Sequence, residues 1–207
     1  VREVTISVLS GMESEGDARS YTRCVREGGC RLVHVQTSGG YFNYGQPLRL
    51  DHPVNGVSFE GALRYCAWIG GRLPTEAEWE FMARGSDGRR FPWGDEVPRC
   101  EVGGSRGAPQ GCPREGTRPP GILERPSAAG LNAMGGGVWE WVSDGYAPYD
   151  PMALVDPQRE AQGAERVQRG RPITSEDPLE RRAAYRASMP RETQASDVGF
   201  RCVKSAP

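Results

Sequence analysis

The spacing of apolar residues predicts a helix near the middle of the chain. It follows Ser58, whose hydroxyl can cap the amino end of a helix, and it ends at Gly70. Its apolar residues recur every three or four positions, as one face of a helix requires: Ala62, Tyr65, Cys66 and Ile69. We expect this face to pack against the core.

A second helix is predicted directly after the first. Thr75 and Glu78 have the spacing of a capping box, in which each side chain bonds to the backbone amide of the other residue. Trp79 and Met82 lie three residues apart and mark the buried face of this helix. A further helix is expected earlier in the chain, over residues 18–26.

Strands are predicted to be few and short, since apolar or alternating stretches are brief. They cover Val4–Leu9, Val138–Val142, Val167–Arg169 and Arg182–Ala187. The 207 residues include 28 Gly and 17 Pro, which favour turns and loops over long regular elements. The length fits one large domain or two small ones.

The charge and hydropathy of the chain exclude some classes of partner. A formal net charge of −1 gives no reason to expect nucleic acid or an anionic membrane. No apolar run approaches the roughly 18 residues that a membrane span needs, so we expect no span in this chain. Because the first residue is Val1 rather than Met, we expect a processed or truncated sequence that has lost any upstream targeting signal.

Six cysteines allow 15 disulfide connectivities. With no CxxC and only two histidines, His34 and His52, zinc is poorly supported. Three disulfides in an oxidising compartment are the favoured interpretation, and buried free thiols in a cytosolic protein are the alternative. Cys24 and Cys30 flank the end of the helix over residues 18–26, so we pair them as a local staple. Cys100 and Cys112 would pin a long loop.

Four blocks, in this order, resemble the formylglycine-generating enzyme family, the sulfatase-modifying factors. They are Gly70–Glu80 (GGRLPTEAEWE), Phe91–Asp95 (FPWGD), Val138–Asp144 (VWEWVSD) and Val198–Cys202 (VGFRC). The resemblance implies an α+β fold of the modified C-type-lectin-like kind, with little regular structure, as a single domain over residues 1–207. It also implies a bacterial domain of the periplasm or of secreted proteins, once attached to a larger receptor or kinase.

The resemblance also implies one disulfide. In the family, the cysteine of the first central helix pairs with the one in the closing Gly-Phe-Arg-Cys, which here gives Cys66–Cys202. The residues agree, because Cys66 lies on the apolar face of its helix and Cys202 ends an apolar strand. Such a bond would close a loop of about 136 residues and restrict the unfolded chain strongly.

The family's chemistry is not expected here. Its enzymes oxidise a substrate cysteine to formylglycine with molecular oxygen and a copper ion held by two thiolates, ligands that suit soft copper(I). Counting back from Cys202, those positions hold Ile173 and Pro178, and no cysteine lies between Cys112 and Cys202. We therefore expect neither copper nor formylglycine formation.

Calcium is the metal that the resemblance leaves open. Family members hold it through a Gly-Asn-x-Trp-Glu segment, whose Asn and Glu supply hard oxygen ligands. Here Gly137 replaces the Asn, whereas Glu140 remains. Glu140 is either a calcium ligand or the buried partner of an arginine.

The favoured function is a non-catalytic binding or regulatory module with a protein or peptide partner. Its expected contact surface is the former substrate groove: Arg171, Ile173, Thr174, Glu176, Asp177, Arg186 and Ser188. The alternative is a metal-dependent oxidoreductase or oxygenase that uses the same groove with ligands other than cysteine. His34 and His52 lie too far apart in sequence to suggest the facial triad that non-haem iron needs.

Overall fold

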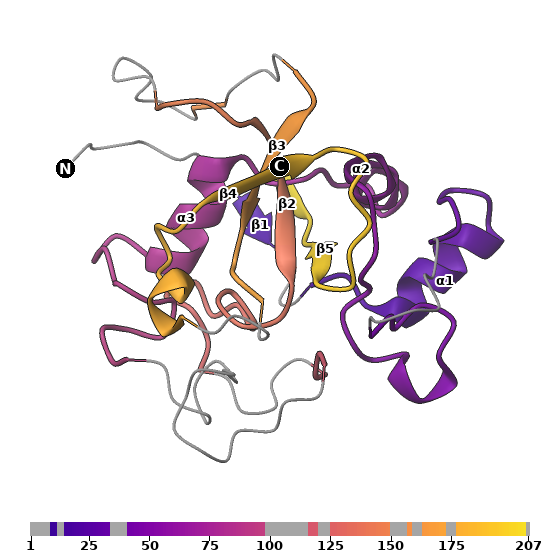
Figure 1. Ribbon diagram of the computed structural model, residues 1–207, viewed down its shortest axis with the longest axis horizontal. Coiled ribbons are helices and arrows are strands. Elements are labelled where there is room, and N and C mark those ends of the chain that lie inside the picture. Colours follow the sequence, from indigo (N-terminus) through magenta and orange to yellow (C-terminus); the bar gives the residue numbers. More distant parts are fainter. Residues whose placement is uncertain are drawn as a thin grey trace.

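A four-stranded sheet forms the centre of the molecule in a computed structural model (Figure 1). The structure describes residues 9–11, 15–33, 41–97, 116–119, 125–149, 157–158, 163–172 and 177–205. The strand order is β4-β3-β2-β5, with β2 at Trp139–Gly145, β3 at Glu165–Arg169, β4 at Ala187–Pro190 and β5 at Val198–Phe200. β3 is antiparallel to both its neighbours, while β5 runs parallel to β2.

A second sheet of two strands joins distant parts of the chain. β1 (Leu9–Gly11) is antiparallel to β6 (Val203–Ser205). A bridge between Arg72 and Val203 connects this sheet to the segment that precedes α3. The closing strand is thereby held from both sides.

Three helices begin at capped residues, and the caps of the second and third were predicted. In α1 (Ala18–Arg26) the Asp17 carboxylate accepts from the backbone of Ser20 at 2.7 Å. In α2 (Phe59–Trp68) the Ser58 hydroxyl accepts from Gly61 at 3.2 Å. The capping box of α3 (Glu76–Arg84) is formed by Thr75 and Glu78.

Two apolar clusters cover opposite faces of the sheet. Trp139 and Trp141 of β2 project into the larger cluster, which includes α1 and α2. Val142 of β2 and Val167 of β3 belong to a second cluster with Trp79 of α3. The alternation of side chains along a strand explains this division, and Figure 1 shows the sheet between α3 on one side and α1 and α2 on the other.

Two disulfides link described residues, as predicted. Cys24 pairs with Cys30 just after α1, and Cys66 of α2 pairs with Cys202, which follows β5. The expected Cys100–Cys112 bond lies outside the described residues. Disulfides of this kind indicate an oxidising compartment. In the part of the chain that the structure describes, no helix is long and apolar enough to cross a membrane.

One predicted strand is wrong. Residues 182–186 follow a short 3-10 helix, η2 (Pro178–Arg181). They form a bend and a turn and then two residues without regular structure, so the strand begins only at Ala187. The Ala183 amide donates to Arg90 and the Tyr185 amide to Arg182, which keeps these residues out of the ladder. The first predicted strand, Val4–Leu9, lies outside the described residues except for Leu9. A second short 3-10 helix, η1, covers Pro47–Arg49.

Candidate functional site

The structure describes four of the seven residues expected to line the former groove, namely Arg171, Asp177, Arg186 and Ser188. Ile173, Thr174 and Glu176 lie outside the described residues. The four do not share their contacts, so they must be placed one at a time.

Arg171 lies across two aromatic rings. Gly170, which directly follows β3, has a φ of 73°, and a Cβ there would lie 2.9 Å from the Trp79 ring, so glycine suits this turn. Beyond it, the Arg171 guanidinium lies 5.2 Å from the ring centre of Trp139 and 5.8 Å from that of Tyr185. These distances are typical of cation–π contacts.

A carboxylate holds the same guanidinium from the side. Arg171 Nη2 lies 2.5 Å from Glu180 Oε2, and the hydroxyl of Tyr185 donates to Glu180 Oε1 at 3.2 Å. Burial raises the pKa of the Tyr185 phenol, and the negative charge of Glu180 adds to the effect. Arg171, Tyr185 and Glu180 therefore form one connected group.

Asp197 is a second acidic residue beside this group. Its backbone carbonyl accepts from the Trp139 amide at 2.7 Å. Burial raises the pKa of the Asp197 carboxyl, although the Arg171 charge acts in the opposite direction. The Asp197 carboxyl is thus partly desolvated.

Asp177 and Pro178 have a local structural role. Asp177 caps η2, its carboxylate accepting from the backbone of Leu179 at 2.8 Å. Pro178 is the first residue of η2, where its fixed φ and missing N–H are tolerated. In this chain, the position that the resemblance assigns to a catalytic thiolate is instead the first residue of a helical turn.

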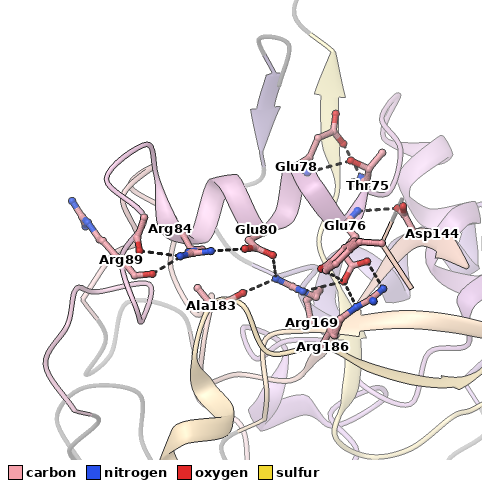
Figure 2. A network of polar contacts seen from close by, with 12 residues as sticks. Thr75, Glu76, Glu78, Glu80, Arg84, Arg89, Asp144, Arg169, Ala183 and Arg186 are labelled. Carbon is pink, nitrogen blue, oxygen red and sulfur yellow. Dashed lines mark hydrogen bonds and ion pairs between the residues drawn. The ribbon is translucent and has the colours of Figure 1, made fainter. Parts of the chain in front are cut away.

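Arg186 belongs to a different group, an ion-pair network around Glu76 (Figure 2). Its guanidinium donates to both oxygens of Glu76, at 2.8 and 2.7 Å, and to the carbonyl of Ala147 at 2.9 Å. The rings of Tyr146 and Tyr149 lie 4.7 and 4.3 Å from it. The Arg186 guanidinium therefore makes most of its hydrogen bonds within the chain.

The network continues from Glu76 through Arg169 to Glu80. Arg169, which is fully buried, donates to Glu76 at 3.0 Å and to Glu80 at 2.7 Å. Burial acts to lower the pKa of Arg169, but the two carboxylates outweigh it and raise the pKa. The Tyr149 hydroxyl lies 3.1 Å from Oε1 of Glu76, and burial raises the pKa of the Tyr149 phenol to about 12. These contacts attach α3 to β3 and to the segment before β4.

Ser188 contributes to the sheet rather than to either arginine. It pairs with Val167 in the ladder of β3 and β4 and is half-buried. Among the described groove residues, Arg171 and Arg186 each join an aromatic and acidic group, and the two groups consist of different residues.

Glu140 pairs with an arginine, as one of the two alternatives predicted. Arg201 donates to both Glu140 oxygens at 2.6 Å, and the Trp79 indole donates to Oε2 at 2.6 Å. Both members of the pair have no exposed side-chain surface. A guanidinium in contact with both oxygens occupies the place that a cation would need.

The neighbouring position also does not fit calcium. A Cβ on Gly137 would lie 1.7 Å from Oε1 of Glu15, a buried carboxylate that also accepts from the Val138 amide at 2.9 Å. Glu15 therefore fills the space where a side chain at position 137 would begin. The described residues fit neither the calcium site of the family nor, with Pro178 in place of a thiolate, its copper site.

The described part of the chain contains no group of three or more His, Cys, Asp or Glu side chains placed to hold a metal ion. The oxidoreductase alternative thus receives no support from a ligand set there. The contribution of Trp139, Tyr185, Glu180 and Asp197 was not predicted. Trp139 lies in the VWEWVSD motif and Asp197 directly precedes VGFRC, but Glu180 and Tyr185 belong to no motif, so no common sequence signal connects the four residues.

The fold and these motifs together define a domain of the modified C-type-lectin-like kind. The model of the sulfatase-modifying factor enzyme 1-like domain matches residues 12–206. The chain belongs to this family, as its motifs predicted.

Named relatives within the family differ in their described activity. The formylglycine-generating enzyme of Streptomyces coelicolor is 39% identical over 175 residues, which cover 76% of this chain and 54% of that protein. The inactive Cα-formylglycine-generating enzyme 2 of Bos taurus is 32% identical over 166 residues, covering 76% and 52%. The serine/threonine-protein kinase Pkn1 of Chlamydia trachomatis is 37% identical over 166 residues, covering 77% of this chain and 25% of the kinase. The chain thus spans about half of the length of the two formylglycine-generating enzymes and a quarter of the length of the kinase.

Solved structures share the fold at low sequence identity. PvdO from Pseudomonas aeruginosa superposes with a TM-score of 0.79 at 23% identity, covering 96% of this chain and 80% of PvdO. Variable protein 1 of Treponema denticola gives a TM-score of 0.74 at 19% identity, covering 98% and 86%. These similarities establish the fold only.

Proposed function

We propose that this domain is a non-catalytic member of its family that binds a protein or peptide partner outside the cytoplasm. The observation that carries the proposal is the replacement of the thiolate pair. Pro178 begins η2, Ile173 stands at the other position, and no cysteine lies between Cys112 and Cys202. Without two thiolates, the copper chemistry that the family uses has no ligands here.

The chemistry around Arg171 supports recognition. Arginine, tyrosine and tryptophan are the residue types that contribute most to protein interfaces. Here all three meet, since Arg171 stacks on Trp139 and Tyr185. The group also contains Glu180, which can fix the direction of a polar contact.

Two comparisons agree with the proposal. The bovine relative is named as inactive, so loss of activity has a precedent among sequences with similar identity to this chain. The match to a quarter of the Chlamydia kinase supports a domain carried by a longer protein.

The disulfides Cys24–Cys30 and Cys66–Cys202 support an extracytoplasmic location, because such bonds persist where thiols are oxidised.

Selection of a displayed library of random peptides on the folded domain tests this function. We expect enriched peptides whose dissociation constants change at least tenfold when residues 171–177 are replaced by alanine or when Tyr185→Ala is introduced. Arg19→Ala is the matched control, because it removes another arginine in an ion pair, with Asp51, that takes no part in the group around Arg171. No enrichment, or peptides that respond equally to the control, would overturn the proposal.

A further inference from the structure

We propose that Trp139, Tyr185, Glu180 and Asp197 form a site for a cationic side chain, which Arg171 of the same chain occupies. We call this group the cation site. The inference rests on the proposed binding function and names the chemistry of its ligand, a peptide that presents an arginine or lysine. Arg171 then acts as an internal competitor that the ligand's cation displaces.

The floor of the cation site is aromatic. The ring centres of Trp139 and Tyr185 lie 6.1 Å apart with their planes inclined by 32°, and one guanidinium contacts both. Ring faces carry partial negative charge and attract cations, most strongly where water is excluded. Trp139 is only 3% exposed, so its face is already withdrawn from water.

The rim of the cation site is acidic. Glu180 pairs with Arg171 at 2.5 Å. Asp197 is a second acidic residue beside the aromatic floor, because its backbone carbonyl accepts from the Trp139 amide at 2.7 Å. A site lined by acidic residues favours cations over anions.

Arg171 does not satisfy all of its donors in this position. Its Nε is buried and has no hydrogen-bond partner among the described residues. A buried donor without a partner reduces the net gain from the ion pair and the ring contacts. Arg171 is therefore held incompletely, and a cation that reaches the same rings and carboxylates from a peptide can replace it.

Competition within the chain predicts the effect of removing Arg171. A group tethered beside its site has an effective concentration in the millimolar range or above, so it weakens every external competitor. The Arg171→Ala variant removes this competitor while leaving the rings and carboxylates. It should bind a free arginine side chain more tightly than the wild type does.

Calorimetric titration with N-acetyl-arginine amide tests the inference. We expect Arg171→Ala to lower the dissociation constant at least tenfold relative to wild type. The matched ligand N-acetyl-citrulline amide has the same shape without the charge, and it should not bind either protein. Adding Glu180→Gln to Arg171→Ala should reverse most of the gain. Arg171→Gly provides a second opened variant if the alanine variant is poorly folded, as judged by thermal unfolding.

Two results would overturn the cation site. One is equal binding of the arginine and citrulline probes by both opened variants, or no binding of either. The other is Arg171-dependent binding of N-acetyl-glutamate amide to the wild type, which would make Arg171 the receptor for an anion. Either result leaves the peptide selection intact as a separate test, because that experiment asks for any peptide at this surface regardless of charge.

Discussion

Arg201 and Glu140 form a two-point ion pair that is completely withdrawn from solvent. Both contacts measure 2.6 Å, and neither side chain has exposed surface. Arg201 also donates to the carbonyl of Asn132 at 2.9 Å. The pair therefore joins β2 to the end of β5 and to the loop that precedes β2, across the face covered by α3.

Breaking this pair should destabilise the domain strongly. Glu140→Ala leaves the Arg201 charge buried, and the loss of one partner of a buried pair costs about 3–5 kcal/mol. Urea denaturation of both proteins measures the difference in the free energy of unfolding. Glu60→Gln is the control, since it breaks the exposed pair with Arg64 on α2 and should change stability by only about 0.3–0.5 kcal/mol. Similar losses for the two variants would contradict the assigned role of Glu140.

The two described disulfides should contribute unequally. The Cys66–Cys202 bond spans 136 residues and the Cys24–Cys30 bond spans 6. Chain-entropy arguments give a loss of about 5 kcal/mol for replacing the first pair by alanine and about 2 kcal/mol for the second. Chemical denaturation of the two double variants gives these values directly. A larger loss from the short loop would refute the ranking.

Calcium should not stabilise this domain through Glu140. We expect the thermal midpoint to be the same in EDTA and in excess calcium. Gly137→Asn should not restore such a site, because its Cβ would collide with Glu15. We expect this variant to lose about 2–3 kcal/mol by overpacking. Gly28→Asn is the control, as a Cβ there meets nothing within 4 Å and asparagine tolerates its φ of 79°. Calcium-dependent stabilisation of Gly137→Asn would contradict the account.

The Asp197 carboxyl should make stability fall as pH rises. Its pKa in the folded domain is raised above the ordinary 3.8 by burial, so the folded state binds this proton more tightly than the unfolded state. The stabilising contribution is complete below pH 3.8 and is lost as the pH rises through the folded pKa. Asp197→Asn should therefore be more stable than wild type at pH 7, with a difference that shrinks as the pH falls toward 4.

Asp87→Asn provides the control of opposite sign. A hydrogen bond from Arg89 lowers the pKa of the Asp87 carboxyl, so its contribution is present at neutral pH and lost in acid. This variant should be slightly less stable than wild type at pH 7. Paired urea titrations at several pH values compare the two. An Asp197→Asn variant that is less stable at pH 7 would show that its charge is favourable in the fold.

Local patterns explain which parts of the fold could be predicted. The capping box of Thr75 and Glu78 and the apolar face with Ala62 and Cys66 depend on residues within one or two turns, so the sequence displays them directly. The strand predicted at Arg182–Ala187 failed because the turns after η2 depend on a contact with Arg90, far back in the chain. Alternation over six residues could not reveal that contact.

The site depends on partners that no local pattern connects. Arg169 and Glu76 are 93 positions apart, and Glu15 lies 123 positions before Val138. An arginine partner was one of the two roles predicted for Glu140, but nothing in the sequence singled out Arg201 among many arginines. Arg186 was predicted for the contact surface without any indication that it also bonds to Glu76. The structure shows that Arg171 pairs with Glu180 and Arg186 with Glu76, a difference that the sequence does not reveal.

Incubation with a cysteine-containing sulfatase peptide, copper and oxygen tests most directly whether this chain has lost the family's reaction. Mass spectrometry of the peptide gives the readout, and the Streptomyces coelicolor relative serves as the positive control. With Ile173 and Pro178 at the thiolate positions, we predict that the peptide mass stays unchanged with this domain while the relative converts the cysteine to formylglycine. Conversion by this domain at a rate comparable with the relative would contradict the account.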